Sequence, residues 1–498
     1  MMCAPNKYIL ILLLTLGVLF NKTSAQQVNT LYFMDNVPLR HTLNPSFQPT
    51  QHLYISLPVI GFTQFSIGNN SVSMKDVIYN YNGTTVSAFD AVGGNNGKFY
   101  RRLSSTTSIN ASAEVNLMSI GLKHKDAFWS FSLTEKFQSS IGIPKDIFKI
   151  ALFGTPELFN NDFELTTMES DATLYTEAAL GYATKLNKKW AVGAKLKYLY
   201  GTANFSNINT DLYLNAGVDK WTIAGAGSVN YSSPIALNLA ADFSSLTYKL
   251  PKDLNDWMKK SGSGFGVDIG ATYKASKVLT LSAGLVDLGF IKWKRNALNV
   301  NFESNFTFDG IGVIDSIKTI SGAQDAIDKF GNGTFLSDSL VTALKAASVY
   351  GNSQNSYRTA TPTTLNVGAE YALMETKLTL GLLSRTQLFK KILTEEITLS
   401  LNAKPVDWFN ASVSTSLFAG RLSSVGTAFG LRTGFVHWFL AADYIPFQKS
   451  TFYGFPIPYT TEVFNFALGI NLVFDQPEKN IGLRKQKNKK GCISCGYY

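Results

Sequence analysis

Residues 463–474 have the sequence VFNFALGINLVF, in which a large apolar side chain occupies every second position. Phe464, Phe466 and Leu468 belong to this apolar row, whereas the row between them is small or polar, as at Asn465. A period of two places the rows on opposite faces of an extended strand, and a helix would mix them. The stretch therefore predicts a strand of about ten residues with one apolar face.

The same alternation recurs at 190–201 and 264–274, with an aromatic residue near one or both ends of each segment. A membrane-spanning β-strand needs about 9–11 residues, an apolar outer row and aromatic side chains at the level of the lipid headgroups. A strand of a soluble sandwich also alternates, but it is shorter and its polar row is rich in Lys, Glu and Thr. Here the second row contains Gly, Ala and Asn with isolated charges at Glu177, Lys195, Asp268, Glu370 and Arg385. This mixture favours a membrane barrel with a crowded, wet lumen.

Fourteen segments of this kind follow one another along the chain. They lie at 52–66, 107–123, 126–140, 172–186, 189–205, 264–274, 277–288, 361–373, 376–387, 392–404, 407–418, 424–433, 436–446 and 463–474. An even number of antiparallel strands is typical of bacterial outer-membrane barrels.

The connections between these segments alternate in length. After each even-numbered segment the chain turns within about two residues, for example at His124-Lys125. The long insertions follow odd-numbered segments, at 67–106, 141–171, 206–263 and 289–360, as does the shorter 447–462. A barrel that starts and ends in the periplasm has short inner turns and long outer loops, and a soluble fold has no reason for this alternation. The sequence therefore predicts an all-β fold, a closed antiparallel transmembrane β-barrel of about 14 strands over residues 51–474. We expect it in the outer membrane of a Gram-negative bacterium, with membrane lipid and the outer-membrane assembly machinery as partners.

The start of the chain indicates export. Of the 498 residues, 45% are hydrophobic and 13% aromatic, which excludes an intrinsically disordered protein. The mean hydropathy of +0.03 is far below that of a helical membrane protein. Lys7, the apolar run at 8–20 and the small residues Thr23-Ser24-Ala25 predict a signal peptide over residues 1–25.

The net charge of +10 is concentrated at the two ends of the chain, because residues 26–474 carry only +4. A nucleic-acid-binding protein would carry a basic stripe on its folded part, so we expect no nucleic-acid partner. Residues 475–498 form a basic tail, which we expect in the periplasm. Cys492 and Cys495 in this tail are spaced as a Cys-x-x-Cys, which predicts a short disulfide or an inert tail, because no further zinc ligand or redox domain accompanies them.

The sequence carries no motif that predicts catalysis, a cofactor or a bound metal. The four histidines do not share metal-ligand spacing, and there is no Gly-x-Ser-x-Gly elbow, phosphate-binding loop or dinucleotide fingerprint. An outer-membrane lipase would need a His–Ser pair on the lipid-facing side, whereas His437 falls in the lumenal row of its segment. We therefore predict that the protein is not an enzyme.

The long insertions contain candidate ligand contacts. Short amphipathic helices are predicted after Pro144 and Pro251, a third from Ser337, and a hairpin within 207–231. These loops could cap the pore, receive an apolar ligand or simply pack on one another. The candidate apolar contacts are Trp257, Met258, Leu340 and Leu344.

The part of the mature chain that precedes the first strand is too irregular to form a strand of the barrel wall. Residues 26–50 are punctuated by prolines and contain NPSFQP at 44–49. The segment either folds into the lumen as a plug, with Asn44, Pro45 and Phe47 fixing its position, or is a mobile periplasmic lead.

Three stretches resemble a known family. LYFMDNVP at 31–38, LNPSF at 43–47 and VDLGFIKW at 286–293 look like an uncharacterised family of envelope barrels in bacteria that use type IX secretion. The resemblance extends more distantly to FadL-type hydrophobic-compound transporters and to the PorV-type barrel of the type IX secretion system. It implies a fourteen-stranded barrel with an N-terminal plug, whose two longest outer loops, here 206–263 and 289–360, collect an apolar ligand. Asn44-Pro45 is similar to an Asn-Pro-Ala of FadL-type proteins, with Ser46 in place of Ala, and the 24 residues after Phe474 depart from the common pattern.

Two functions are compatible with this reading. The first is passive uptake of a hydrophobic or amphipathic small molecule past the plug. The second is a barrel that does not transport but docks exported proteins or anchors an envelope or secretion complex. Transport predicts a continuous path past the plug, and docking predicts a sealed lumen with an exposed apolar loop patch.

Overall fold

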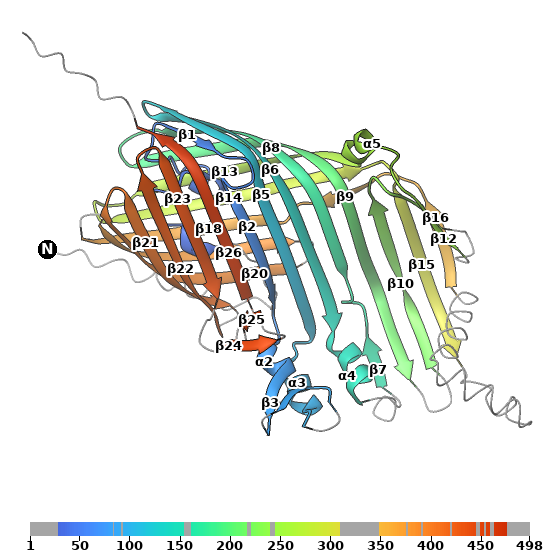
Figure 1. Ribbon diagram of the computed structural model, residues 1–498. Coiled ribbons are helices and arrows are strands. Elements are labelled where there is room, and N and C mark those ends of the chain that lie inside the picture. The colour runs from blue at the N-terminus through green and yellow to red at the C-terminus, as the bar shows by residue number, and fades with distance from the viewer. Residues whose placement is uncertain are drawn as a thin grey trace, which may run out of the picture.

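The computed structural model describes residues 28–82, 84–90, 93–153, 161–216, 221–239, 245–308, 348–374, 377–389, 392–418, 421–444, 449–452, 455–458 and 463–475. Most of these residues lie in strands that follow one another around a single wall (Figure 1). The predicted signal peptide, the region of the third predicted helix with Leu340 and Leu344, and the Cys492–Cys495 tail fall outside the described residues.

The wall is a closed ring with fourteen positions in the described chain. In chain order these are β1 with β2 (Leu53–Ser56, Thr63–Asn69), β5 (Thr106–His124), β6 (Ala127–Pro144), β8 (Ser170–Lys185), β9 (Trp190–Ala216), β13 (Gly262–Lys274), β14 (Leu279–Trp293), β17 with β18 (Tyr357–Ala360, Thr363–Met374), β19 (Leu378–Phe389), β20 (Ile392–Val406), β21 (Phe409–Phe418), β22 (Arg421–Thr433), β23 (Val436–Tyr444) and β26 (Val463–Phe474). Each position pairs antiparallel with the next, and β26 pairs with both β1 and β2, which closes the ring. The predicted closed barrel is confirmed.

The two ends of the barrel differ as the loop lengths predict. Short turns join β5 to β6, β8 to β9 and β13 to β14 at the end that we call the inner end, on the left of Figure 1. The insertions lie at the opposite, outer end. They contain α2 (Met74–Val77), β3 (Ile78–Tyr81), β4 (Thr84–Ser87), α3 (Asn96–Arg102), α4 (Lys145–Phe153), β7 (Asn161–Glu164), β10 (Trp221–Ser232), β11 (Ala236–Leu239), β12 (Leu246–Lys249), α5 (Leu254–Met258), β15 (Leu298–Phe308), β16 (Ser348–Ser353), β24 (Lys449–Phe452) and β25 (Phe455–Pro458).

Two predicted helices and the predicted hairpin are present. The helix α4 begins directly after Pro144, and α5 begins after Asp253, whose side chain accepts a hydrogen bond from the backbone N–H of Asp256. The hairpin consists of β10 paired with the outer part of β9, which therefore runs on to Ala216 instead of ending near 205.

Two positions of the wall are each divided in the structure. The segment predicted at 52–66 divides into β1 and β2 around Pro58 and Val59, which has a φ of 66°. The segment predicted at 361–373 is present as β18, and Thr361-Pro362 at its start separate β18 from the short β17. Proline cannot donate to a strand ladder, which explains why both breaks include one.

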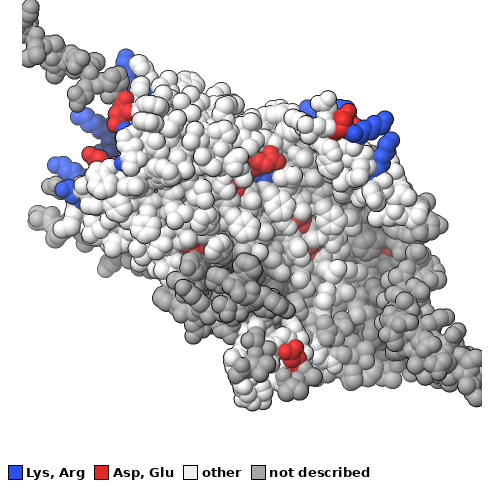
Figure 2. Space-filling model, in the orientation of Figure 1, with Lys and Arg blue, Asp and Glu red and all other residues white. Residues whose placement is uncertain are grey.

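The outward face of the wall is apolar. Along β26, exposed or half-buried Phe464, Phe466 and Leu468 alternate with buried Asn465 and Ala467. In Figure 2 the Lys and Arg side chains gather at the two ends of the molecule and leave most of the wall between them uncharged.

Aromatic pairs lie on this outward face near the inner end. Trp129 packs against Tyr182 and Trp190 against Tyr273, with ring centroids 4.5 and 4.6 Å apart. None of the helices in the described part of the chain combines the length and apolar character that a helical membrane crossing requires. In a closed ring every strand has a hydrogen-bonded neighbour on both sides, so the backbone polar groups are paired within the lipid. An apolar band with aromatic girdles is the surface of an outer-membrane β-barrel.

Candidate functional site

The lumen contains the N-terminal segment, which we define as residues 28–51. It includes two 3-10 helices, η1 (Asn29–Leu31) and η2 (Pro38–Thr42), and most of its side chains are buried. Leu31 and Met34 pack against Phe439 and Ala441 of β23, so a hydrophobic core lies between the segment and the wall.

Hydrogen bonds tie the first part of the segment to several wall strands. The backbone N–H of Asn29 donates to Asp443 Oδ2 at 3.0 Å, and its side-chain amide donates to Glu396 Oε2 at 2.7 Å. The hydroxyl of Thr30 donates to Asp443 and lies 2.6 Å from the hydroxyl of Ser414. These contacts join the segment to β20, β21 and β23.

The second part of the segment contacts other strands of the ring. His41 Nε2 lies 2.5 Å from the hydroxyl of Tyr54 on β1. The side-chain amide of Asn366 on β18 donates to the carbonyl of Leu43 at 2.9 Å, and the hydroxyls of Ser46 and Thr272 on β13 are 2.7 Å apart. The segment is therefore held from many sides of the ring.

Glycines in the lumenal rows make room for this segment. At Gly193 on β9 an added Cβ would collide with the carbonyl of Pro45, and at Gly270 on β13 it would collide with the side-chain oxygen of Asn44. Only a residue without a side chain permits such close approach. The small residues of the lumenal row, which the sequence analysis attributed to crowding, are thus contact points for the segment.

The three residues predicted to fix the plug lie together in the lumen. Asn44 is fully buried, and its Oδ1 accepts hydrogen bonds from the backbone N–H and the hydroxyl of Ser46, at 3.0 and 2.8 Å. This bonding closes a tight turn that presents Pro45 to β9. The Phe47 ring packs edge-on against Tyr32 at 5.1 Å and carries the Arg40 guanidinium over its face at 4.0 Å.

A cluster of charged side chains fills the lumenal side of β6, β8, β9, β13 and β14. Lys197 Nζ lies 3.2, 2.8 and 2.6 Å from carboxylate oxygens of Glu177, Asp268 and Asp287. Lys136 Nζ lies 3.0 Å from Glu177 and 2.9 Å from Asp287. All five side chains are buried or nearly so, and we call them the charged cluster.

The charges that stand singly along the sequence of each lumenal row mostly lie near other charges in the structure. Glu177 and Asp268 belong to the charged cluster, and Lys195 lies within electrostatic reach of Asp268. Arg385 on β19 interacts with the charges of Glu396, Glu114 and Asp287, and so links opposite sides of the ring. The register of the strands explains this, because it places charged lumenal side chains of different strands at the same height along the barrel.

The sequence analysis did not single out Lys136 or Asp287 as site residues. Asp287 lies in a β-bulge of β14, with a φ of 61°, and its backbone N–H donates to Asp268 Oδ1 at 2.7 Å. A bulge shifts the alternation by one residue, so period two alone would have placed Asp287 on the other face.

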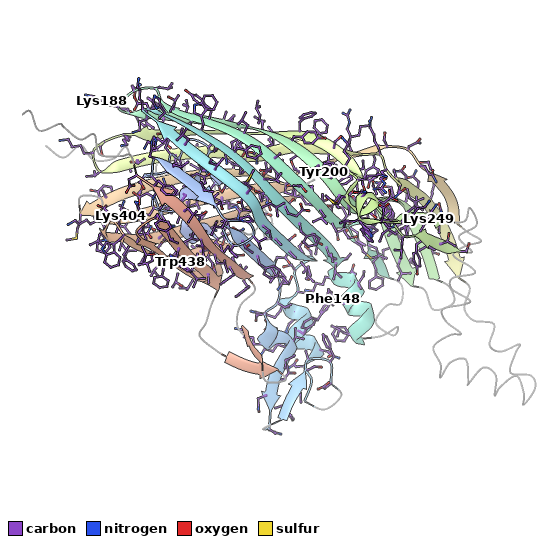
Figure 3. All side chains as sticks on the ribbon, turned by 45° about the horizontal axis from the view of Figure 1, so that its top comes forward. Phe148, Lys188, Tyr200, Lys249, Lys404 and Trp438 are labelled. Atoms are coloured by element: carbon purple, nitrogen blue, oxygen red, sulfur yellow. The ribbon has the colours of Figure 1, made fainter. Side chains whose placement is uncertain are left out.

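A cavity of about 530 Å³ opens beside the N-terminal segment at the inner end. Its apolar lining comes from Phe33, Met34 and Phe47 of the segment. Its charged lining includes Arg40, Lys274 and Glu370. Figure 3 shows Lys404, which also lines this cavity, at the same end of the barrel as the inner-turn Lys188. The cavity thus offers an apolar surface and a mostly basic one to the same space.

The predicted outer-loop contacts do not lie beside this cavity. Trp257 and Met258 are exposed on α5 at the outer end. The carbonyl of Met258 accepts a hydrogen bond from Tyr200, which belongs to the outward row of β9. His437 is buried in the lumenal row, as predicted. The described residues contain no group of three His, Cys, Asp or Glu side chains placed to hold a metal ion.

The chain has remote likeness to several solved structures of bacterial proteins. The toluene transporter TodX of P. putida is 10% identical, with a TM-score of 0.37, and the match covers 87% of this chain and 93% of TodX. A Pseudomonas aeruginosa FadL homologue is 10% identical, with a TM-score of 0.35 and coverages of 89% and 94%. The translocator domain of the autotransporter NalP from Neisseria meningitidis is 8% identical, with a TM-score of 0.30 and coverages of 89% and 96%.

Sequence comparison gives one family. No curated protein matches the chain. A family model described as "Family of unknown function (DUF5723)" matches residues 45–443. This range includes most of the barrel and begins at Pro45, within the turn that Asn44 closes. The chain belongs to this family.

Proposed function

We propose that this protein is a passive outer-membrane channel for hydrophobic or amphipathic small molecules, in which the N-terminal segment is the plug. The observation that carries the proposal is the placement of the segment. It fills the lumen through hydrogen bonds and packing, and the chain continues into the wall only at its end, at β1. An element held in this way can leave the lumen without opening the ring of strands.

The proposed class of substrate follows from the surfaces beside the plug. The wall of the lumen is largely polar, whereas Phe33, Met34 and Phe47 of the segment supply apolar surface to the cavity. The cavity at the inner end joins this surface to basic side chains. A molecule with an apolar body and a polar end would contact the apolar side chains with its body and the basic side chains with its end. This mixture of apolar and polar groups is the usual composition of a small-molecule site.

A reversible lock on the plug tests this proposal. Ser46 and Thr272 have hydroxyls 2.7 Å apart, so cysteines at both positions can form a disulfide between the segment and β13. The chain, with its native cysteines changed to serine, is placed in liposomes that are given octyl sulfonate, an amphiphile whose permanent charge slows its crossing of bare lipid. We expect uptake to fall to the level of protein-free liposomes when the disulfide forms and to return when it is reduced.

The matched control is a disulfide within the wall. Thr173 on β8 and Asn204 on β9 are cross-strand partners, with the Asn204 side-chain amide 2.9 Å from the Thr173 hydroxyl, and the Thr173→Cys/Asn204→Cys pair should leave uptake unchanged in both redox states. Uptake that is the same whether the disulfide between positions 46 and 272 is formed or reduced would contradict the assignment of the segment as the plug. Equal, negligible uptake by the intact chain and by a chain without residues 26–50 would contradict transport.

The relationship to type IX secretion and the docking role stay predictions of the sequence. They become the next hypotheses to test if the transport experiment fails.

A further inference from the structure

The outer end of β9 carries an apolar surface that faces away from the lumen. It consists of β12, the connection that follows and α5, and we call residues 246–260 the outer patch. Its large side chains are highly exposed, with exposed fractions of 73% for Leu254, 70% for Tyr248 and 65% for Met258. A contiguous apolar patch of this kind marks an interaction site.

Two contacts place the outer patch on the lipid-facing side of the barrel. Tyr198 and Tyr200 belong to the outward row of β9, where they alternate with buried Lys197 and Leu199. Tyr200 donates to the carbonyl of Met258, and Lys260 Nζ donates to the hydroxyl of Tyr198 at 3.1 Å. The outer patch is therefore continuous with the surface that meets the membrane.

The level of the outer patch corresponds to the lipid headgroups. Tyr198 packs edge-on against Phe265 of β13 at 5.6 Å, and both rings point outward. Outward aromatics near the end of spanning strands form the girdle at the membrane interface. Figure 3 shows Tyr200 and Lys249 toward the same end of the barrel, and Figure 1 places α5 on the outside of the wall there.

The charge of the outer patch is basic. It has four lysines, at 249, 252, 259 and 260, against Asp253 and Asp256. Both carboxylates are engaged locally, since Asp253 caps α5 and Asp256 lies 2.6 Å from Lys259 Nζ. Within the described residues, Lys249 and Lys252 have no carboxylate partner, and both are exposed.

We propose that the outer patch anchors the barrel in the outer leaflet of the membrane by binding lipid whose headgroup carries phosphate. Leu254, Met258 and Tyr248 enter the apolar edge of the leaflet, and Lys249 and Lys252 meet the phosphates. Apolar side chains flanked by lysines are the composition of segments that lie in a membrane interface. This inference does not depend on transport through the lumen.

Hydrogen exchange of the full chain tests the proposal. The chain is placed in nanodiscs that contain either diphosphorylated lipid A or its monophosphorylated form, which share the same acyl chains. Exchange of the backbone amides of 246–258 is followed by mass spectrometry. We expect exchange about fivefold slower or more with the diphosphorylated lipid, because lysines near a membrane respond to its surface charge.

The matched variants are both double substitutions of exposed lysines in outer loops. Lys249→Gln/Lys252→Gln should abolish the difference between the two lipids, and Lys75→Gln/Lys98→Gln, on another loop, should keep it. Equal exchange in the two lipids, or a difference that survives Lys249→Gln/Lys252→Gln, would overturn the proposal. Protection in maltoside micelles that grows with protein concentration would assign the patch to a second copy of the chain and would also overturn it.

Discussion

The lumen has two halves that satisfy their polar side chains differently. In the ion-pair half, on β6, β8, β9, β13 and β14, charged groups pair with one another, as Lys197 does with Asp268. In the segment half, on β20, β21 and β23, polar groups pair with the N-terminal segment, as Asp443 does with Thr30. The charged cluster needs no partner from the segment, although β9 and β13 also contact the segment through Gly193 and Thr272. Asp443, by contrast, uses the segment as a partner.

This difference shows which contacts the wall can lose. When the segment leaves, the segment half exposes hydroxyls and carboxylates, which water solvates well, together with the apolar Phe439 and Ala441. The charged cluster keeps its partners in either state, because they all come from wall strands. The comparison therefore supports a plug that leaves while the wall stays closed.

The largest expected effect comes from breaking the ion-pair half. Lys197→Met leaves three buried carboxylates without their shared cation, and removing one partner of a buried ion pair costs about 3–5 kcal/mol. We expect the urea midpoint of unfolding in vesicles to fall accordingly, with an unchanged slope. Lys188→Met, at an exposed inner turn, is the control. Equal midpoints for the two variants would show that the charged cluster does not stabilise the wall.

The next effect tests the packing of the segment at a close contact with β13, a strand of the ion-pair half. Gly270→Ala places a methyl group against Asn44, and overpacking of this kind costs about 1–3 kcal/mol. The undocked segment should become about tenfold more populated, and single-channel conductance should rise while the urea midpoint of the wall is unchanged. Gly266→Ala on the same strand is the control, because the nearest atoms to its methyl group are 3.5 Å away. Similar conductance in both variants would contradict the close packing of the segment.

A smaller effect isolates one hydrogen-bonded group of the segment. Thr30→Val keeps the shape of the side chain but removes the hydroxyl contacts with Asp443 and Ser414, which is worth about 1–3 kcal/mol. Amide exchange of residues 28–36 should become about tenfold faster. Thr42→Val is the control, since the Thr42 hydroxyl donates only to Leu39 within the segment in the described contacts. Equal exchange in the two variants would mean that the wall hydrogen bonds do not hold the segment.

The barrel could be predicted because each strand repeats the same local rule. Lipid requires apolar side chains at alternate positions, so the pattern at 463–474 and the alternation of loop lengths are both visible in the sequence. The sequence also indicates that the proline-punctuated stretch before the first strand does not form wall, but it leaves open whether Asn44, Pro45 and Phe47 belong to a plug or to a mobile periplasmic lead.

The charged cluster and the direction of α5 could not be predicted, because neither follows from a local rule. Asp287 reaches the lumen through a bulge, and Lys136 meets it only through the register of non-adjacent strands. The amphipathic pattern around Trp257 predicts a helix but not which side of the wall that helix covers. Its position is fixed instead by the contacts with Tyr198 and Tyr200.

The smallest expected effect is at an acid outside the lumen, which can be compared with the carboxylates of the charged cluster. Asp76 on α2 accepts hydrogen bonds from the backbone N–H and hydroxyl of Ser73, at 3.0 and 2.8 Å, and lies 3.4 Å from Arg102. Burial alone would raise the pKa of Asp76, but the hydrogen bonds from Ser73 and the charge of Arg102 outweigh burial and hold the pKa below its ordinary value. These partners keep the Asp76 carboxylate charged.

The sign of the pH dependence follows from that lowered pKa. The contribution of Asp76 to stability is fully present above its ordinary value of about 3.9 and is lost as the pH falls through the lowered one. Amide exchange of residues 73–77, corrected for intrinsic rates, should therefore accelerate only in strong acid. The acceleration should be less than about tenfold, because exposed pairs contribute about 1 kcal/mol or less. Asp76→Asn should exchange faster at neutral pH and lose this acid dependence. If Asp76→Asn kept the acid dependence of exchange, another titratable group would be responsible for it. Asp76 would then not serve as the outer-loop acid with which the charged cluster is compared.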